Sequence, residues 1–166
     1  MDHFIIDTSL TKEQQDYLID HHRECQDAYY KHTVGSDYTN LDMLFMFEDP
    51  IVAEIASSFS LPPSRATLMH VAPNATIVPH VDGTEYQRLS AVVFPLLPDA
   101  KKFAPTILYK DENAYHLHSS CYVFSTQTLH GVENNDNSRL ALQLWYSESV
   151  EELYELQKNG KFFLSH

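Results

Sequence analysis

Residues 77–96 read IVPHVDGTEYQRLSAVVFPL, and the expected architecture of the chain rests mainly on these twenty residues. Its second half belongs to an apolar run, residues 88–97, that is typical of a buried strand as far as Pro95. Its first half ends a short strand and runs through Pro79 and His80 into a turn. Side chains two residues apart on an extended backbone share a face. We therefore expect His80 and Asp82 to project together from a strand-to-turn junction.

The same period of two extends over most of the chain after Arg65. Strand patterns occupy residues 66–71, 75–78, 88–97, 106–109, 115–118, 121–125 and 139–146. About seven short strands at close spacing, preceded by helices, are typical of two packed antiparallel sheets. The fold class that we expect is mainly β with flanking helices, a β-sandwich or jelly roll with a helical layer on one sheet.

Helical patterns lie on both sides of these strands. Thr11 and Gln14 form a capping-box pattern, and apolar residues recur at helical spacing as far as Tyr29. A second helix is expected from Pro50 to about residue 59. The tail has an acidic first turn and Lys158 near its end, which suits the helix dipole. We predict one domain over residues 1–166, with N-terminal helices at about 11–60, a jelly-roll core at about 65–146 and a C-terminal helix at about 147–158.

Composition narrows the class of partner. The 166 residues carry 11 Lys+Arg against 23 Asp+Glu, a net charge of −12, with no basic run that could neutralise several phosphates. We expect no nucleic-acid partner and no membrane partner. Two cysteines, Cys25 and Cys121, are too few for a disulfide framework and are expected to be reduced. No secretory signal or membrane-spanning run is visible, so we expect a cytoplasmic protein.

The pair His80 and Asp82 gains weight from His130, fifty residues further along the chain. Two imidazoles and one carboxylate on one face of a metal form the 2-His-1-carboxylate arrangement, which leaves open positions on Fe(II). These three residues are our candidate metal ligands and catalytic centre. The alternative is an Asp that caps a turn beside a half-buried His.

Arg139 opens a strand that is otherwise mostly apolar (RLALQLWY, residues 139–146). A guanidinium there is costly to bury unless it meets an anion, and its planar fork suits a carboxylate. The partner is either a carboxylate ligand or an acidic side chain of the chain itself.

The order His-x-Asp, distal His, then Arg nine residues later resembles the double-stranded β-helix family of Fe(II)/2-oxoglutarate dioxygenases, over about residues 65–146. The resemblance implies that His80, Asp82 and His130 bind Fe(II), and that Arg139 holds the distal carboxylate of the cosubstrate 2-oxoglutarate. Many members carry Arg-x-Ser on the last strand. Here that position is Ala141, so the resemblance implies a hydroxyl partner elsewhere, with Tyr109 and Ser90 as candidates.

Within that family, residues 77–96 are similar to the aspartyl/asparaginyl β-hydroxylase branch, and the chain also resembles the prolyl-hydroxylase-like branch. The first similarity implies that Arg88 contacts the cosubstrate carboxylate, although a structural arginine is an equal alternative. Asp82 departs from that branch, which typically lacks the carboxylate ligand. The function implied is hydroxylation of a C–H bond in a peptide, a protein side chain or an amino acid, with dioxygen as co-reactant.

Two other function classes remain open. His116 and His118 share a face of a strand and, with His130, could form a cupin-type metal site that needs no 2-oxoglutarate. A non-catalytic jelly-roll binding or structural protein is the other. A further histidine set, His21, His22 and His32, is expected on a solvated face of a helical region. Nucleotide-binding, serine-hydrolase and zinc-protease motifs are absent from the sequence.

Overall fold

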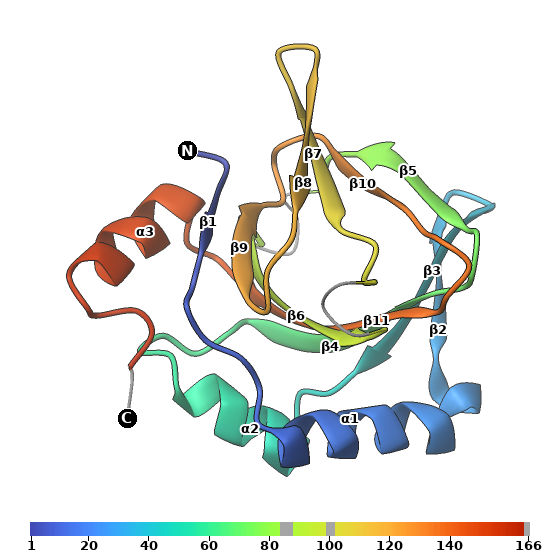
Figure 1. Cartoon of the computed structure of the whole chain (residues 1–166), viewed down its shortest axis with the longest axis horizontal. Coiled ribbons are helices and arrows are strands. Elements are labelled where there is room, and N and C mark those ends of the chain that lie inside the picture. The colour runs from blue at the N-terminus through green and yellow to red at the C-terminus, as the bar shows by residue number, and fades with distance from the viewer. Residues whose placement is uncertain (84–87, 99–101, 165–166) are drawn as a thin grey trace.

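In the computed structural model, which describes residues 1–83, 88–98 and 102–164, two antiparallel sheets face each other (Figure 1). The major sheet has the order β1 (His3–Ile5), β9 (Tyr122–Ser125), β6 (Ser90–Leu97), β11 (Arg139–Tyr146), β4 (Arg65–Val71), β3 (Asp37–Phe45), β2 (Tyr30–Val34). The minor sheet has the order β5 (Thr76–His80), β10 (His130–Glu133), β7 (Thr106–Lys110), β8 (Asn113–Leu117). This architecture confirms the expected mainly β jelly roll with flanking helices.

The first two helices begin where the sequence predicts, because their caps are local, and the third begins at Val150 rather than at about residue 147. Thr11 and Gln14 complete a capping box at the start of α1 (Lys12–Glu24), and the Asp49 carboxylate accepts two backbone N–H groups at the start of α2 (Pro50–Ser57). Ser149 opens α3 (Val150–Lys158) with a second capping box. A 3-10 turn, η1 (Gln26–Ala28), follows α1. Within the described part of the chain, no helix is both long and apolar enough to cross a bilayer.

The expected N-terminal helical region, about residues 11–60, is wrong between residues 30 and 45, which form the β2–β3 hairpin of the major sheet. The helix ends at Glu24, so the apolar spacing that continues to Tyr29 is not a helical face. β3 pairs with β4 from Leu41 to Phe45, and Leu41 and Met43 of β3 enter the core. Strands β1 and β10, of three and four residues, were also missed because such short segments carry no periodic signal.

Two cores lie on the two faces of the major sheet, as β11 shows. Leu140, Leu142 and Leu144 belong to the core beneath the helices, and in Figure 1 α1 and α2 lie along this side of the sheet. Ala141 and Trp145 belong to the core between the sheets. Because alternate residues of a strand point to opposite faces, the inward set is Arg139, Ala141, Gln143 and Trp145. β11 therefore places two polar groups inside the jelly roll.

Candidate metal centre

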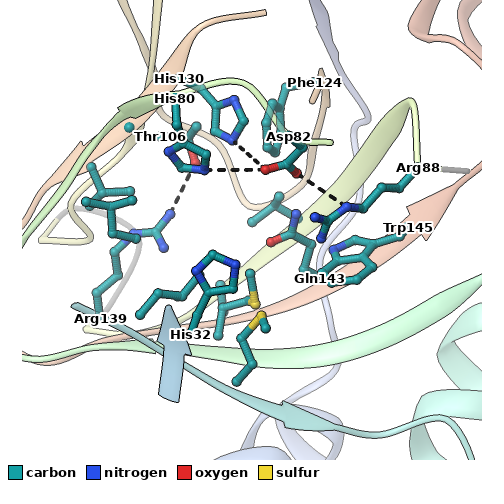
Figure 2. A pocket seen from close by; sticks show the side chains of 18 residues that line it. His32, His80, Asp82, Arg88, Thr106, Phe124, His130, Arg139, Gln143 and Trp145 are labelled. Carbon is teal, nitrogen blue, oxygen red and sulfur yellow. Dashed lines mark hydrogen bonds and ion pairs between the residues drawn. The ribbon is translucent and has the colours of Figure 1, made fainter. Parts of the chain in front are cut away.

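His80, Asp82 and His130 meet at one end of the space between the sheets (Figure 2). β5 ends at His80, and the antiparallel pairing of β10 with β5 places His130 directly opposite it. The Nε2 atoms of His80 and His130 lie 3.4 and 3.9 Å from Oδ1 of Asp82. One donor atom from each residue falls within 4.8 Å of the other two. The structure thus brings together the three residues that the sequence selected.

Backbone hydrogen bonds orient both imidazoles. Nδ1 of His80 lies 2.8 Å from the Val78 carbonyl oxygen, and Nδ1 of His130 lies 2.8 Å from the Thr128 carbonyl oxygen. A carbonyl can only accept, so Nδ1 carries the proton in each ring and donates it. In the neutral rings, Nε2 then keeps its lone pair and faces Asp82. This is the outer-sphere arrangement that prepares histidines as metal ligands.

Gly131 permits the close approach that sets this geometry. A Cβ atom at this position would lie 2.7 Å from the Ile77 carbonyl oxygen and 3.2 Å from the Pro79 backbone nitrogen. Both neighbours are backbone atoms of β5 and cannot rotate away. A side chain here would push β10 from β5 and separate His130 from His80.

The Asp82 carboxylate is half-buried among positive groups. Burial opposes its ionisation, but the hydrogen bond from His80 and the charges of His130 and Arg88 hold its pKa below the ordinary value. Conversely, the hydrogen bond with Asp82 raises the pKa of His80. Burial lowers the pKa of His130 despite the attraction of Asp82. The site combines an ionised carboxylate with imidazoles in a partly dry setting, which is the donor set that a divalent cation needs.

Arg139 lies at the far end of the same cavity, whose volume is about 60 Å³. It is 4% exposed; its Nε donates to the Ala104 carbonyl (2.7 Å), and its guanidinium stacks on Phe103. No carboxylate among the described residues pairs with Arg139, so the internal ion pair considered as an alternative is not found there. Burial lowers the pKa of its guanidinium. A buried cation without a counter-ion favours an anionic ligand.

The hydroxyl groups beside Arg139 are not those suggested by the sequence. Nη2 of Arg139 lies 3.2 Å from Oγ1 of Thr106, which is 2.9 Å from the hydroxyl of Tyr122. Tyr109 and Ser90 do not line the cavity, and the Ser90 hydroxyl donates to the Glu148 carbonyl instead. Both proposed partners are therefore wrong. Thr106 opens β7 and Tyr122 opens β9, and no local pattern marks either as a neighbour of Arg139.

Arg88 is placed on the other side of the triad from Arg139 (Figure 2). Its Nε lies 3.9 Å from Oδ2 of Asp82, and its guanidinium lies 4.6 Å from the ring centre of Trp145. It thus lines the cavity next to the candidate metal ligands. Its contact with a cosubstrate carboxylate stays a prediction.

The two other histidine sets, His116 with His118 and His21 with His22 and His32, do not as a whole lie where the sequence predicted. His116 and His118 are exposed, with rings 6.3 Å apart, and they do not line the cavity with His130. His22 is buried against Tyr29 and His70. His32 lies on β2 and lines the cavity. The prediction that these histidines lie on a solvated helical face is therefore wrong for His22, which is buried, and for His32, which lies on a strand.

The sequence reasoning also missed cavity residues of the major sheet. Gln143 and Trp145 line the cavity beside Arg139 because they occupy the same face of β11. The period of two from Arg139 was the signal that could have found them. His32 gave no such signal, because its strand was read as helix.

No family model matches the chain, and no curated protein sequence matches it. Among solved structures, a prolyl-4-hydroxylase of Pseudomonas putida is similar with a TM-score of 0.68 and 12% identity, over 87% of this chain and 91% of that one. A viral collagen prolyl hydroxylase from Paramecium bursaria Chlorella virus-1, in complex with 2-oxoglutarate, has a TM-score of 0.62 and 13% identity, over 87% and 94%. A 2-oxoglutarate/Fe(II) oxygenase family protein of Burkholderia pseudomallei has a TM-score of 0.60 and 10% identity, over 89% and 86%. At these identities the likeness shows that the chain has the jelly-roll fold of these oxygenases.

Proposed function

We propose that this protein is an Fe(II)- and 2-oxoglutarate-dependent oxygenase that hydroxylates a C–H bond of a peptide, a protein side chain or an amino acid. The observation that carries the proposal is the pairing, within one cavity, of a 2-His-1-carboxylate cluster with a buried arginine that has no carboxylate partner among the described residues. The shared fold with 2-oxoglutarate oxygenases supports it.

The donor atoms fit ferrous iron. His80, Asp82 and His130 offer two imidazole nitrogens and one carboxylate oxygen, a set that suits Fe(II) and leaves further coordination positions open. Thiolates would favour zinc or iron–sulfur clusters, but Cys25 and Cys121 do not line the cavity. The orienting carbonyls of Val78 and Thr128 keep both histidines ready to bind through Nε2.

The opposite end of the cavity fits a dicarboxylic acid. Arg139 would hold the distal carboxylate of 2-oxoglutarate, with Thr106 as a second donor and Tyr122 holding the Thr106 hydroxyl. A guanidinium has five N–H donors, so donors remain beyond those used for Ala104 and Thr106. The small volume of the cavity restricts what can lie between Arg139 and the triad to a small molecule.

When bound, iron and 2-oxoglutarate supply the oxidising chemistry together with dioxygen. The chain's own residues do the positioning. The triad would hold the metal at one end of the cavity, and Arg139 would hold the cosubstrate at the other. Apolar walls that include Phe124 and Val93 would exclude water between them.

An anaerobic titration tests the proposal. Purified apoprotein receives Fe(II) and then 2-oxoglutarate, and the visible charge-transfer band of the chelate is recorded. We expect the band in the wild type and its loss in His80→Ala, while a His116→Ala/His118→Ala double variant keeps it because both residues are exposed and outside the cavity.

The alternatives give different results. Metal binding without the band would move the assignment to a cupin-type protein that needs no 2-oxoglutarate. A band that is present in the wild type but lost in the His116/His118 variant would instead place the metal ligands among those two histidines. Failure to bind any metal would leave a non-catalytic jelly-roll protein.

The named activities of the similar structures, a prolyl-4-hydroxylase and a collagen prolyl hydroxylase, support a peptide or protein substrate for the enzyme proposed here.

A further inference from the structure

We call the cavity that holds the triad and Arg139 the inner cavity. A second, open pocket of about 610 Å³ adjoins it, and we call this second pocket the outer groove. His80, Asp82, Arg88 and Trp145 line both spaces, so the groove leads directly to the candidate metal ligands. Its tenfold larger volume suits a ligand much bulkier than the inner cavity admits. Its described lining is Tyr30, His32, Thr33, Met43, Phe45, Arg65, His80, Val81, Asp82, Gly83, Arg88 and Trp145.

Two guanidiniums are stacked against aromatic rings in this groove. Those of Arg65 and Arg88 lie 5.9 and 4.6 Å from the ring centre of Trp145, and Arg65 also lies 5.8 Å from that of Phe45. Figure 2 shows Arg88 beside Trp145 at the edge of the inner cavity. A stacked guanidinium keeps its charge and presents N–H donors in the plane of its edge, where a carboxylate can meet them.

The described lining of the groove holds two arginines, although the protein as a whole is acidic. The chain carries a net charge of −12, yet Asp82, a candidate metal ligand, is the only acidic residue in the described lining. Clefts that gather one sign of charge attract ligands of the other sign. The groove therefore favours an anionic ligand.

The indole of Trp145 adds an independent indication of a ligand. Trp145 is 2% exposed, and its Nε1 has no hydrogen-bond acceptor among the described residues. Buried donors in folded proteins are nearly always paired, so an acceptor on a bound molecule would complete this one.

The rim of the groove favours a peptide over a small acid. Tyr30, His32 and Thr33 belong to β2, the last strand of the major sheet in the described part of the chain. The outer edge of such a strand offers backbone groups to an added extended segment. Tyr30 and Phe45 are about half-exposed and offer apolar surface for its side chains.

We propose that the outer groove binds an extended peptide segment that carries acidic side chains, with Arg65 as the residue that selects a carboxylate near the oxidised position. This names the substrate class of the oxygenase proposed above and depends on that function. Arg65, on β4, contacts no candidate metal ligand in the described structure, so its role is separable from metal binding.

The single tryptophan of the chain provides the signal for the test, because Trp145 lines the groove as well as the inner cavity. The inner cavity is filled before the titration, so a later change in fluorescence reports on the groove. The protein, loaded anaerobically with Fe(II) and 2-oxoglutarate, is titrated with an N-acetylated, C-amidated hexaglutamate peptide. The matched probes are the hexaglutamine peptide and N-acetylglutamate. The variant is Arg65→Gln, and the control is Arg23→Gln, which alters an exposed arginine of α1 paired with Asp20.

We expect a saturable fluorescence change with hexaglutamate that weakens as salt rises, and a Kd about tenfold higher in Arg65→Gln, the lower end for a hydrogen bond to a charged group. Arg23→Gln should match the wild type. Equal binding of hexaglutamine, an equal response to N-acetylglutamate, or no saturable response would each overturn the inference. If Arg65→Gln does not fold, the salt dependence of the wild type replaces it as the test. A Kd for hexaglutamate that does not change with salt would then overturn the inference. The charge-transfer band forms in every one of these cases if the proposed function is correct, and its absence refutes that function separately.

Discussion

Replacing Arg139 by methionine is expected to weaken 2-oxoglutarate binding through the distal carboxylate alone. The substitution keeps an unbranched side chain against Phe103 but removes the guanidinium that faces the inner cavity. A hydrogen bond to a charged group contributes about 1.5–3 kcal/mol. Since about 1.4 kcal/mol is tenfold in affinity, loss of one such bond raises the Kd roughly 10- to 150-fold.

The assay compares two cosubstrates by the anaerobic charge-transfer titration. One is 2-oxoglutarate, and the other is 2-oxopentanoate, which has the same chain length and the same chelating end but no distal carboxylate. The wild type should prefer 2-oxoglutarate by the factor given above. Arg139→Met should lose that preference and bind 2-oxopentanoate as the wild type does, because the triad that holds the metal lies at the other end of the cavity.

The comparison also separates a local effect from a global one. If the variant lost affinity equally for both acids, Arg139 would be acting through the fold or the metal. If it lost affinity for neither, the buried guanidinium would not bind the cosubstrate, and the reasoning from its missing carboxylate partner would be refuted.

Three further predictions concern the close approach at Gly131, the Thr106 hydroxyl and the buried imidazole of His22. Gly131→Ala places a Cβ 2.7 Å from the Ile77 carbonyl oxygen, so we expect a free energy of unfolding about 1–3 kcal/mol lower and weaker Fe(II) binding. Urea denaturation and calorimetric titration with Fe(II) measure the two effects, and unchanged curves would contradict the close approach. Thr106→Val removes the hydroxyl beside Arg139 and should raise the Kd for 2-oxoglutarate roughly 2- to 12-fold, whereas an unchanged charge-transfer titration would show that this hydroxyl faces no ligand. Burial lowers the pKa of His22 from 6.5 to about 4, so the unfolded chain takes up its proton at higher pH than the folded one, and stability should fall as the pH drops from about 6.5 to about 4. Urea unfolding of the wild type and His22→Gln across that window checks the sign, since the variant should show a shallower fall and an equal slope would exclude His22.

The sequence alone predicted what depends on neighbouring residues. The starts of α1 and α2 were readable because Thr11 and Asp49 cap backbone groups within three residues of themselves. The C-terminal helix was expected from about residue 147, and α3 begins at Val150 after its cap, Ser149. β6 and β11 were readable because long apolar runs mark strands buried on both faces.

The candidate metal ligands could also be found in advance. His80 and Asp82 are two residues apart on an extended segment, so a local rule places them together. His130 is distant in sequence, and what linked it to them was the resemblance in residue order rather than any property of its own surroundings.

The tertiary structure decided the rest, because it depends on pairings between distant segments. Residues 37–45 form a strand through ladders with β2 and β4, although the sequence before them read as helix. The hydroxyl that Arg139 meets belongs to Thr106, 33 residues away, and His32 reached the cavity only through that hairpin. Hydrogen-bond partners and cavity walls of this kind are set by sheet register, which a strand's own residues do not encode. The sequence therefore determined the chemistry of the candidate centre, and the packing of the two sheets determined which side chains surround it.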